Sequence, residues 1–316
     1  MYKKLLASGL VITLLTTGTT YQAEAANEHK PKEDIFIQGA DLNQNQLHKT
    51  KELLGVGKNV TTYEVNHNDV VRYTGTEYDF IHSSAYIKPK KFGRGVSVTI
   101  ETPDNITRIT REQYINAAIT AGIQDAKIKI AAIDRVSGEG ALTGIYKAYE
   151  TQGHTLNQKD IQNAHQEMND LANISETHAK KEGYSDEVLN QSIADMKGQI
   201  AEAKQNNQQI NQTTINHIVN QTIHEHNLHQ ILSDNDIAVI QNLMMNVAKS
   251  DVINQDPKAY EKQANALKDD IRKHAGDKIE ALKNLNPEEA GNFFQRIWNA
   301  IVDFFQRIYL WLMSFL

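Results

Sequence analysis

VSVTIETPDNITRITREQYINAAITAGIQDAKIKIAAIDRVSGEGALTGIYKAYE, from Val96 to Glu150, is the stretch that decides the fold. It opens with a β-branched run, continues with a helical pattern that Thr110 caps and Gly122 closes, and returns to a second β-branched run, AKIKIAAI. A glycine-bearing loop and a helix over about 141–150 follow. Strand, helix and strand at this spacing predict at least one parallel strand pair with helices covering the sheet.

The residues before this stretch extend the same rhythm. IFIQGADLNQNQLHKTKELLGV, beginning at Ile35, predicts a short strand, a turn at Gly39 and a helix that ends at Gly55. Between Asn59 and Glu101, β-branched and aromatic residues form four short runs, which predict four strands: VTTYEV, DVVRYT, SSAYIK and VSVTIE.

Beyond Gly153 the chain is helical in pattern and poor in aromatic residues. Apolar stripes at helical spacing begin at Ile161, Leu189 and Ile237, and Pro257 starts a helix running to about Leu285. The predicted fold is α+β: a mixed α/β domain with at least one parallel strand pair, a helical domain and a C-terminal amphipathic helix. The expected divisions are a signal peptide (1–25), a disordered start (26–34), the α/β domain (35–152), the helical domain (153–286) and the terminal helix (287–316).

The first residues are typical of a secretory signal peptide. Two lysines precede an apolar run from Leu5 to Leu15, and Ala23 and Ala25 supply the small residues that a signal peptidase reads. The run is short for a membrane span, which disfavours an uncleaved anchor. Cleavage after Ala25 would leave 291 of the 316 residues.

Charge and cysteine content narrow the class of protein. The formal net charge of −6 becomes −7 without the signal peptide, which disfavours a nucleic-acid binder. The chain has no cysteine, so disulfides, thiol chemistry and a lipoprotein anchor are excluded. Export without disulfides favours the outside of a Gram-positive cell: the outer side of the cytoplasmic membrane or the cell wall.

The stretch from Val96 to Glu150, together with IQGADLNQNQ and HSSAYI ahead of it, resembles the YpuA-like family of secreted Gram-positive proteins, a family without an assigned function. The resemblance is clearest from Ile35 to Glu150 and weaker through the helical half. It implies export and an architecture of strands and helices, but no activity. The matching motifs are Asn105-Ile106-Thr107, Ile119-Thr120-Ala121-Gly122-Ile123, Val136-Ser137-Gly138 and Ala141-Leu142-Thr143-Gly144-Ile145.

The loop VSGEGALTG lies between a predicted strand and a predicted helix, where free backbone N–H groups hold anions. It lacks the Lys and Ser or Thr of a phosphate-binding P-loop after Gly144, and Arg135 replaces the first glycine of a nucleophile elbow. A structural turn and an anion or glycan contact remain open. The candidate contacts are Ser137, Gly138, Glu139, Gly140 and Thr143.

Two further patterns suggest ligands only weakly. His226 and His229 are three residues apart, so a helix would bring them together, but two ligands do not make a zinc site. Asp41, Asn43 and Asn45 imitate the start of an EF-hand loop without its glycine, and helix capping by Asp41 or Asn43 is the preferred interpretation. No metal, no cofactor and no catalytic residue is therefore predicted.

A compact basic loop, IKPKKFGRG, stands out on an acidic protein. Gram-positive envelopes are rich in polyanions, namely teichoic acid phosphates and anionic lipid headgroups. A solvated loop is the alternative. The candidate polyanion contacts are Lys88, Lys90, Lys91 and Arg94.

The last 24 residues, FFQRIWNAIVDFFQRIYLWLMSFL, form the most apolar segment outside the signal peptide. FFQRI occurs at Phe293 and again at Phe304, eleven residues apart, so both copies present the same face of a helix. At ~100° per residue the polar residues fall within a sector of roughly 120°. The apolar face comprises Phe293, Phe294, Ile297, Trp298, Ile301, Phe304, Phe305, Ile308, Trp311 and Phe315.

Three placements of this helix are open. Spanning a bilayer would bury Arg296, Asp303 and Arg307 at ~2.5 to 3.5 kcal/mol per charge near the centre, which disfavours a span. The narrow polar stripe and aromatic residues suit a helix lying at a membrane surface. The apolar face would otherwise pack on protein, in its own chain or in a second copy.

Together these features predict an exported, non-enzymatic envelope protein of unknown specific role, held at the outer membrane surface by its terminal helix. A wall polymer or a protein would be the partner of the folded part. A cell-wall hydrolase, or an activator of one, is the alternative, and it rests on the compartment alone.

Overall fold

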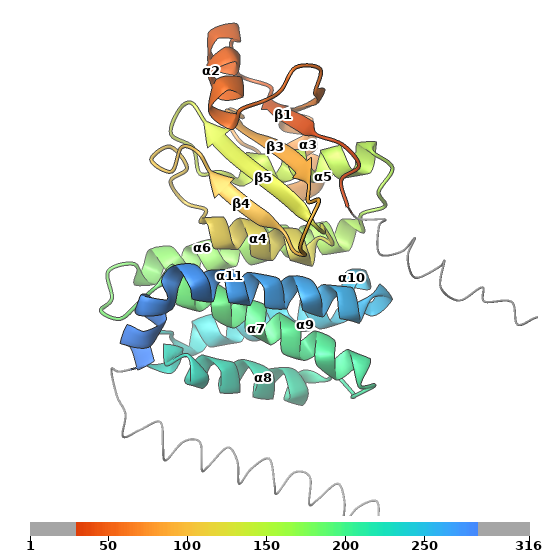
Figure 1. Ribbon diagram of the computed structural model, residues 1–316. Coiled ribbons are helices and arrows are strands. Elements are labelled where there is room, and N and C mark those ends of the chain that lie inside the picture. Colours follow the sequence, from red (N-terminus) through yellow and green to blue (C-terminus); the bar gives the residue numbers. More distant parts are fainter. Residues whose placement is uncertain (1–29, 284–316) are drawn as a thin grey trace, which may run out of the picture.

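The computed structural model describes residues 30–283 (Figure 1). The predicted signal peptide, residues 26–29 of the predicted disordered start and the predicted terminal helix lie outside these residues. Among the residues that are described, no helix is long and apolar enough to cross a membrane.

The N-terminal half is built on a five-stranded sheet in the order β2-β1-β3-β5-β4. β1 and β2 pair in parallel, as do β4 and β5, whereas β3 runs antiparallel to both of its neighbours. The predicted α+β class and its parallel pairs are confirmed. The strands are β1 (Ile35–Gly39), β2 (Thr61–Val65), β3 (Ser83–Pro89), β4 (Ser97–Ile100) and β5 (Ala126–Ala132).

Alternation along the strands gives the sheet two different faces. In β1, Ile35 and Ile37 enter the main core, while Phe36 enters a smaller cluster on the other face. Helices α4 (Arg111–Thr120) and α5 (Glu139–Thr151) pack on the main-core face, and α2 (Gln44–Leu54) covers part of the other (Figure 1). Two layers of helices therefore enclose the sheet unequally.

Capping residues set the first turns of the helices on this sheet. Asn43 caps α2 in a reciprocal capping box with Gln46, which confirms capping over an EF-hand for this segment. Thr110 caps α4 as predicted, through Gln113. Polar residues that resemble ligands in the sequence thus serve to start helices.

The run DVVRYT is not a strand, contrary to the prediction from its β-branched composition. It lies in α3 (His67–Thr74), which begins with a capping box between Asn66 and Asp69. Val70 and Tyr73, three residues apart, are the buried pair, which is helical rather than alternating spacing. The cap and the tertiary packing override the β propensity of the run.

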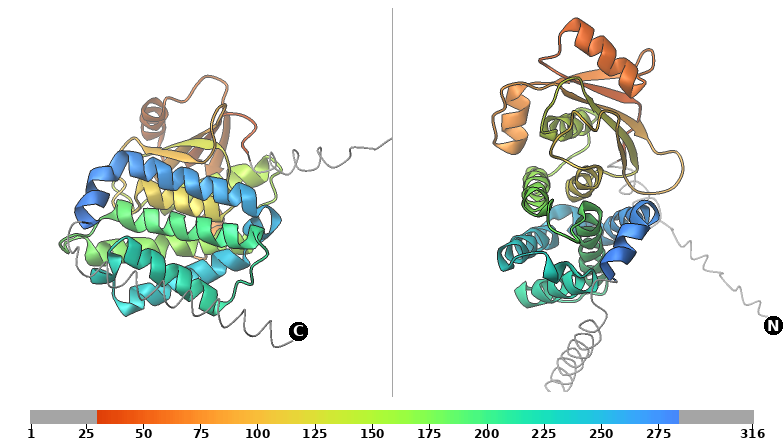
Figure 2. Two further views of the ribbon diagram at one scale, coloured as in Figure 1. Left: turned by 60° about the horizontal axis from the view of Figure 1, so that its bottom comes forward. Right: turned by 90° about the vertical axis from the view of Figure 1, so that its left-hand side faces the viewer.

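The second half is helical, as predicted, and forms a layer beneath the sheet with α7 and α11 side by side (Figure 2). The region from Gln205 to Gln230, rich in Asn and Gln, also forms a helix. The elements are α6 (Gln158–His178), α7 (Asp186–Gln205), α8 (Gln212–Glu225), η1 (Leu228–Gln230), α9 (Asp234–Lys249), α10 (Asp251–Gln255) and α11 (Pro257–Lys283).

One hydrophobic core runs through both halves, from Ile35 in β1 to Ile271 in α11. The predicted boundary between 152 and 153 therefore separates two patterns of sequence without interrupting the core. The division into an α/β domain and a helical domain stays a prediction.

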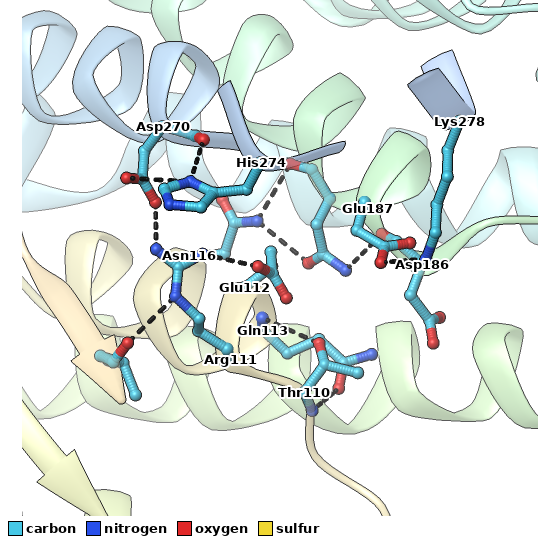
Figure 3. Close-up of polar contacts among 12 residues, drawn as sticks. Thr110, Arg111, Glu112, Gln113, Asn116, Asp186, Glu187, Asp270, His274 and Lys278 are labelled. Atoms are coloured by element: carbon cyan, nitrogen blue, oxygen red, sulfur yellow. Dashed lines mark hydrogen bonds and ion pairs between the residues drawn. The ribbon is translucent and has the colours of Figure 1, made fainter. Parts of the chain in front are cut away.

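Charged side chains fasten α11 to the sheet half and to α7 (Figure 3). Arg111, at the start of α4, pairs with Asp270 of α11 and also donates from Nε to the carbonyl of Val98 in β4 at 3.0 Å. Lys278 of α11 pairs with Glu187 of α7 at 2.6 Å. The last described helix is thus held in a fixed place against both halves.

Candidate functional site

The candidate site is the edge of the sheet at which β1, β2, β4 and β5 end and β3 begins. These four strands are mutually parallel, so their carboxyl ends share one edge. Sheets of this kind bind ligands in the crevice outside the carboxyl ends of their strands. We name this region the carboxyl edge and define it by Asp41, His67, residues 78–82, Asp134 and the start of α5.

Asp41 follows β1 directly and orders one side of the carboxyl edge. Its Oδ2 accepts a hydrogen bond from the backbone N–H of Ile81 at 2.7 Å and lies 3.1 Å from Nε2 of His67. A single carboxylate thus fixes the loop before β3 and the first residue of α3. Both Asp41 and His67 remain partly exposed.

Asp134 follows β5 in the same way. Its Oδ2 lies 2.9 Å from Nδ1 of His82 and accepts a hydrogen bond of 2.9 Å from the side chain of Gln46. The ring of Phe80 lies beside the His82 ring, with centroids 4.9 Å apart, and is 49% exposed. A solvent-facing aromatic ring therefore stands next to a histidine and a carboxylate, a combination suited to a sugar ring or a peptide.

Glu139 is the buried part of the carboxyl edge, and it is paired with the partly buried Arg108. Nη1 of Arg108 lies 2.5 Å from Oε1 of Glu139, the first residue of α5. The other donors of the guanidinium bind three side chains of α6: Asn169, Asn173 and Glu176. Arg108 thereby ties α5 to α6, and its donors are committed within the protein.

Two titratable groups near this pair have shifted pKa values. Burial raises the pKa of Tyr78 to about 12; Glu139 adds to the rise and Arg108 opposes it. Burial lowers the pKa of His165, with Glu139 opposing that shift and Arg108 adding to it. Tyr78 is therefore a neutral hydroxyl at pH 7, and the imidazole of His165 is favoured in its neutral form.

The five predicted loop residues gather at the start of α5, as expected for a strand-to-helix turn. Gly138 has φ of 116°, and a Cβ there would contact the hydroxyl of Tyr114, which donates to the Gly138 carbonyl at 2.6 Å. Glu139 and Thr143 are buried, while Ser137 and Gly140 are partly exposed. The Glu139 side chain is already paired with Arg108, and the anion contact stays a prediction.

The four predicted basic contacts lie away from the carboxyl edge, around the loop from β3 to β4. Lys88 pairs with Asp34 at 3.4 Å and Arg94 with buried Asp125 at 2.9 Å. Nζ of Lys90 donates to the carbonyls of Arg94 and Gly95. Lys91 is exposed, and no ion pair involves it in the part of the chain described. Several of these cations thus have internal partners.

His226 and His229 do not form a metal site in the described residues. Nε2 of His226 lies 3.5 Å from Asp195, while the ring of His229 stacks on that of His224 with centroids 4.1 Å apart. Burial, with help from His229, lowers the pKa of His224 to about 4. Within residues 30–283 no cluster of three His, Cys, Asp or Glu residues is placed to hold a metal.

Sequence reasoning overlooked most of the carboxyl edge. Asp41 and Asp134 each follow a predicted strand directly, and that signal could have placed both at one edge once the strands were taken as parallel. His67, Phe80 and His82 carry no such signal, since the β-branched pattern after His67 predicts a strand and no periodic pattern covers residues 78–82. Their position depends on the register of β3 against β1 and β5.

Comparison with known proteins gives the chain a family. The family described as "Protein of unknown function (DUF1002)" matches residues 38–267, which include four strands of the sheet and the end of β1, the carboxyl edge and most of the helical half. The uncharacterized protein YpuA of Bacillus subtilis (strain 168) is 30% identical over 281 residues, covering 86% of this chain and 89% of that relative. No solved structure matches the chain. The chain therefore belongs to the DUF1002 family, in keeping with its YpuA-like sequence.

Proposed function

We propose that this is an exported, non-enzymatic envelope protein, held at the outer face of the cytoplasmic membrane by residues 293–316. Its carboxyl edge would bind a wall polymer or a partner protein. The observation that carries the proposal is the pattern of the last 24 residues, whose narrow polar stripe and wide aromatic face suit a membrane surface. The signal-like first 25 residues supply the route to that surface.

The geometry of the carboxyl edge supports binding rather than catalysis. Asp41 and Asp134 each accept hydrogen bonds and face a histidine, so their role in the fold is to position loops. Phe80 supplies an exposed aromatic ring there, and an aromatic ring flanked by polar side chains is a common way to hold a glycan or a peptide.

The alternative, an envelope hydrolase, is favoured by one observation. Oε2 of Glu139 is buried and makes no hydrogen bond within the described residues, beside the imidazole of His165. Glycoside hydrolysis needs two carboxyl groups that both reach the substrate. Glu139 is 2% exposed and its Oε1 is held by Arg108, so substrate access would require the Arg108 contact to open.

Removal of the terminal segment is expected to abolish membrane binding. In liposome flotation, residues 26–316 should rise with the vesicles and residues 26–290 should stay at the bottom, because the apolar face is lost. A full-length Ile297→Glu/Ile301→Glu/Ile308→Glu variant should also fail to float, since charges then interrupt that face. Gln306→Glu, on the polar stripe, is the matched control and should float. Equal flotation of all four proteins would reject the terminal segment as the anchor.

Binding at the carboxyl edge is tested separately on purified wall sacculi. Phe80→Ser is expected to weaken cosedimentation at least tenfold, since an aromatic stacking contact contributes ~1 kcal/mol beyond its buried area. Leu53→Ser also replaces an exposed apolar side chain by serine, but in α2, and it should leave binding unchanged. If the original protein releases soluble fragments from sacculi and Glu139→Gln does not, the protein is a hydrolase and the binding proposal is wrong.

A further inference from the structure

The loop between β3 and β4 presents an apolar ring to solvent. Phe92 is 89% exposed, more than any other large apolar side chain among the described residues. Lys91 precedes it, and Gly93 and Gly95 on its other side both have positive φ, which bends the chain into a tip. A phenylalanine this exposed makes little contact with the described fold, so its ring is available to another surface.

The base of this loop is rigid. Buried Asp125 accepts from Nη1 of Arg94 and from the backbone N–H of Gly95, both at 2.9 Å, and from the side chain of Gln263 in α11 at 3.2 Å. Nζ of Lys90 closes the loop by donating to the Arg94 carbonyl at 2.8 Å. Because its base is fixed, the tip can be presented with little loss of conformational entropy on binding.

Lysines continue from the loop onto the open face of the sheet. Lys88 in β3 lies directly opposite Lys127 in β5, and Ile87 and Ile128 beside them are buried in the main core. The two lysines therefore project from the other face, where α2 packs on β5 and β3 around a small cluster that includes Phe36, Tyr86 and Ala131. Lys127 is exposed, and within residues 30–283 no ion pair neutralises it.

We propose that Phe92 and the lysines around it form a second membrane contact, for an anionic lipid surface. Phe92 enters the boundary between headgroups and acyl chains, while Lys91 and Lys127 meet lipid phosphates. Lys88, beside Lys127, stays paired with Asp34. A soluble polyanion would satisfy the lysines but offers no apolar phase for the ring, so the chemistry favours lipid over teichoic acid. The inference rests on the proposed membrane location and adds to it a contact made by the folded part.

Helix α11 makes the two contacts compatible. Gly95 lies so close to α11 that a Cβ there would come within 2.9 Å of Ala266. From Ala266 to Lys283, where the described helix ends, the chain can advance no more than about 25 Å at 1.5 Å per residue. Lys283 thus lies within about 25 Å of the base of the loop, and Phe293 follows ten residues later, so the loop and the terminal segment can reach one membrane surface.

The chain contains no cysteine, so one introduced cysteine gives a single labelling position. Phe92→Cys in residues 26–316, labelled with the environment-sensitive dye NBD, is expected to brighten several-fold with phosphatidylglycerol–phosphatidylcholine vesicles and to change little with pure phosphatidylcholine. Val71→Cys, at an exposed position in α3 on the main-core side of the sheet, is the matched control and should not brighten. A Lys91→Gln/Lys127→Gln pair added to Phe92→Cys should raise the lipid concentration needed for half-maximal brightening roughly 25-fold, about fivefold for each lysine.

Four other outcomes would overturn the inference. If the probe at position 92 does not brighten on protein that still floats through its terminal segment, the loop contact is rejected and the proposed function is unaffected. If the probe does not brighten and the protein does not float, both the loop contact and the proposed membrane location are rejected. Equal brightening with neutral vesicles contradicts the role of the lysines, and brightening by soluble polyphosphate alone assigns the loop to a polyanion instead of lipid.

Discussion

Lys197→Met is expected to lower the free energy of unfolding by about 3 to 5 kcal/mol, the usual cost of leaving one member of a buried ion pair without its partner. Lys197 and Glu167 are 0% and 1% exposed, and Nζ lies 2.6 Å from Oε1. The pair sits where α7 and α6 meet α4, inside the core shared by both halves. Methionine fills a volume similar to that of lysine, so the loss of unfolding free energy reports the removal of the charge.

The remaining contacts explain why Glu167 cannot compensate for that loss. Its Oε2 accepts from the Thr120 hydroxyl at 2.6 Å, and Lys197 also donates to the carbonyl of Asn116 at 2.9 Å. Burial lowers the pKa of Lys197, with Glu167 opposing the shift, so the ammonium depends on this carboxylate to stay charged. Once Lys197 is gone, the Thr120 hydroxyl is the remaining hydrogen-bond donor to the buried carboxylate among the described residues, and α4 also loses a contact to α7.

Urea unfolding at pH 7, followed by circular dichroism, measures the effect. The matched control is Lys197→Met/Glu167→Leu, which should recover most of the lost stability because replacing a whole buried pair by apolar groups is often neutral. A single variant within 1 kcal/mol of the original, or a double variant less stable than the single, would show that the pair does not act as a unit.

The sequence predicts the elements around this pair but not the pair itself. The stripe of Leu189, Ile193, Met196 and Ile200 correctly places the buried face of α7. Lys197 adjoins that stripe and would ordinarily be assigned to solvent, since a lone lysine is seldom buried. Its partner is 30 residues away on another helix. Only the packing of α4 against both α6 and α7 brings the two charges together.

The same limit applies to the carboxyl edge. The unit from Val96 to Glu150 was predictable because its cap, its glycines and its change of period agree at every level. In contrast, residues 78–82 carry no periodic signal, and Asp41 and Asp134 hold them in place from 40 and 52 residues away. The strand prediction for DVVRYT was wrong because its composition favours a strand while the capping residue ahead of it, Asn66, starts a helix.

Gly39→Ala is expected to lower the free energy of unfolding by about 3 kcal/mol, the upper range for overpacking. Gly39 is the last residue of β1, and a Cβ there would overlap the carbonyl oxygen of Ile81. That carbonyl belongs to backbone, which cannot rotate away as a side chain can. The backbone N–H of Ile81 donates to Asp41 at 2.7 Å. A shift of Ile81 that relieves the overlap would therefore break the contact that orders the carboxyl edge.

Thermal and urea unfolding of Gly39→Ala are compared with those of Gly57→Ala, where a Cβ would meet its nearest neighbour, a methyl of Val60, at an ordinary 3.6 Å. Gly57→Ala should stay within about 0.5 kcal/mol of the original or gain slightly, because alanine restricts the unfolded chain. If the carboxyl edge is the binding surface, Gly39→Ala should also lose sacculus binding under conditions in which it remains folded, since residues 78–82 carry Phe80. Unchanged stability in Gly39→Ala would mean that the backbone at Ile81 yields freely, and the carboxyl edge would then be too soft to hold Phe80 in a binding position.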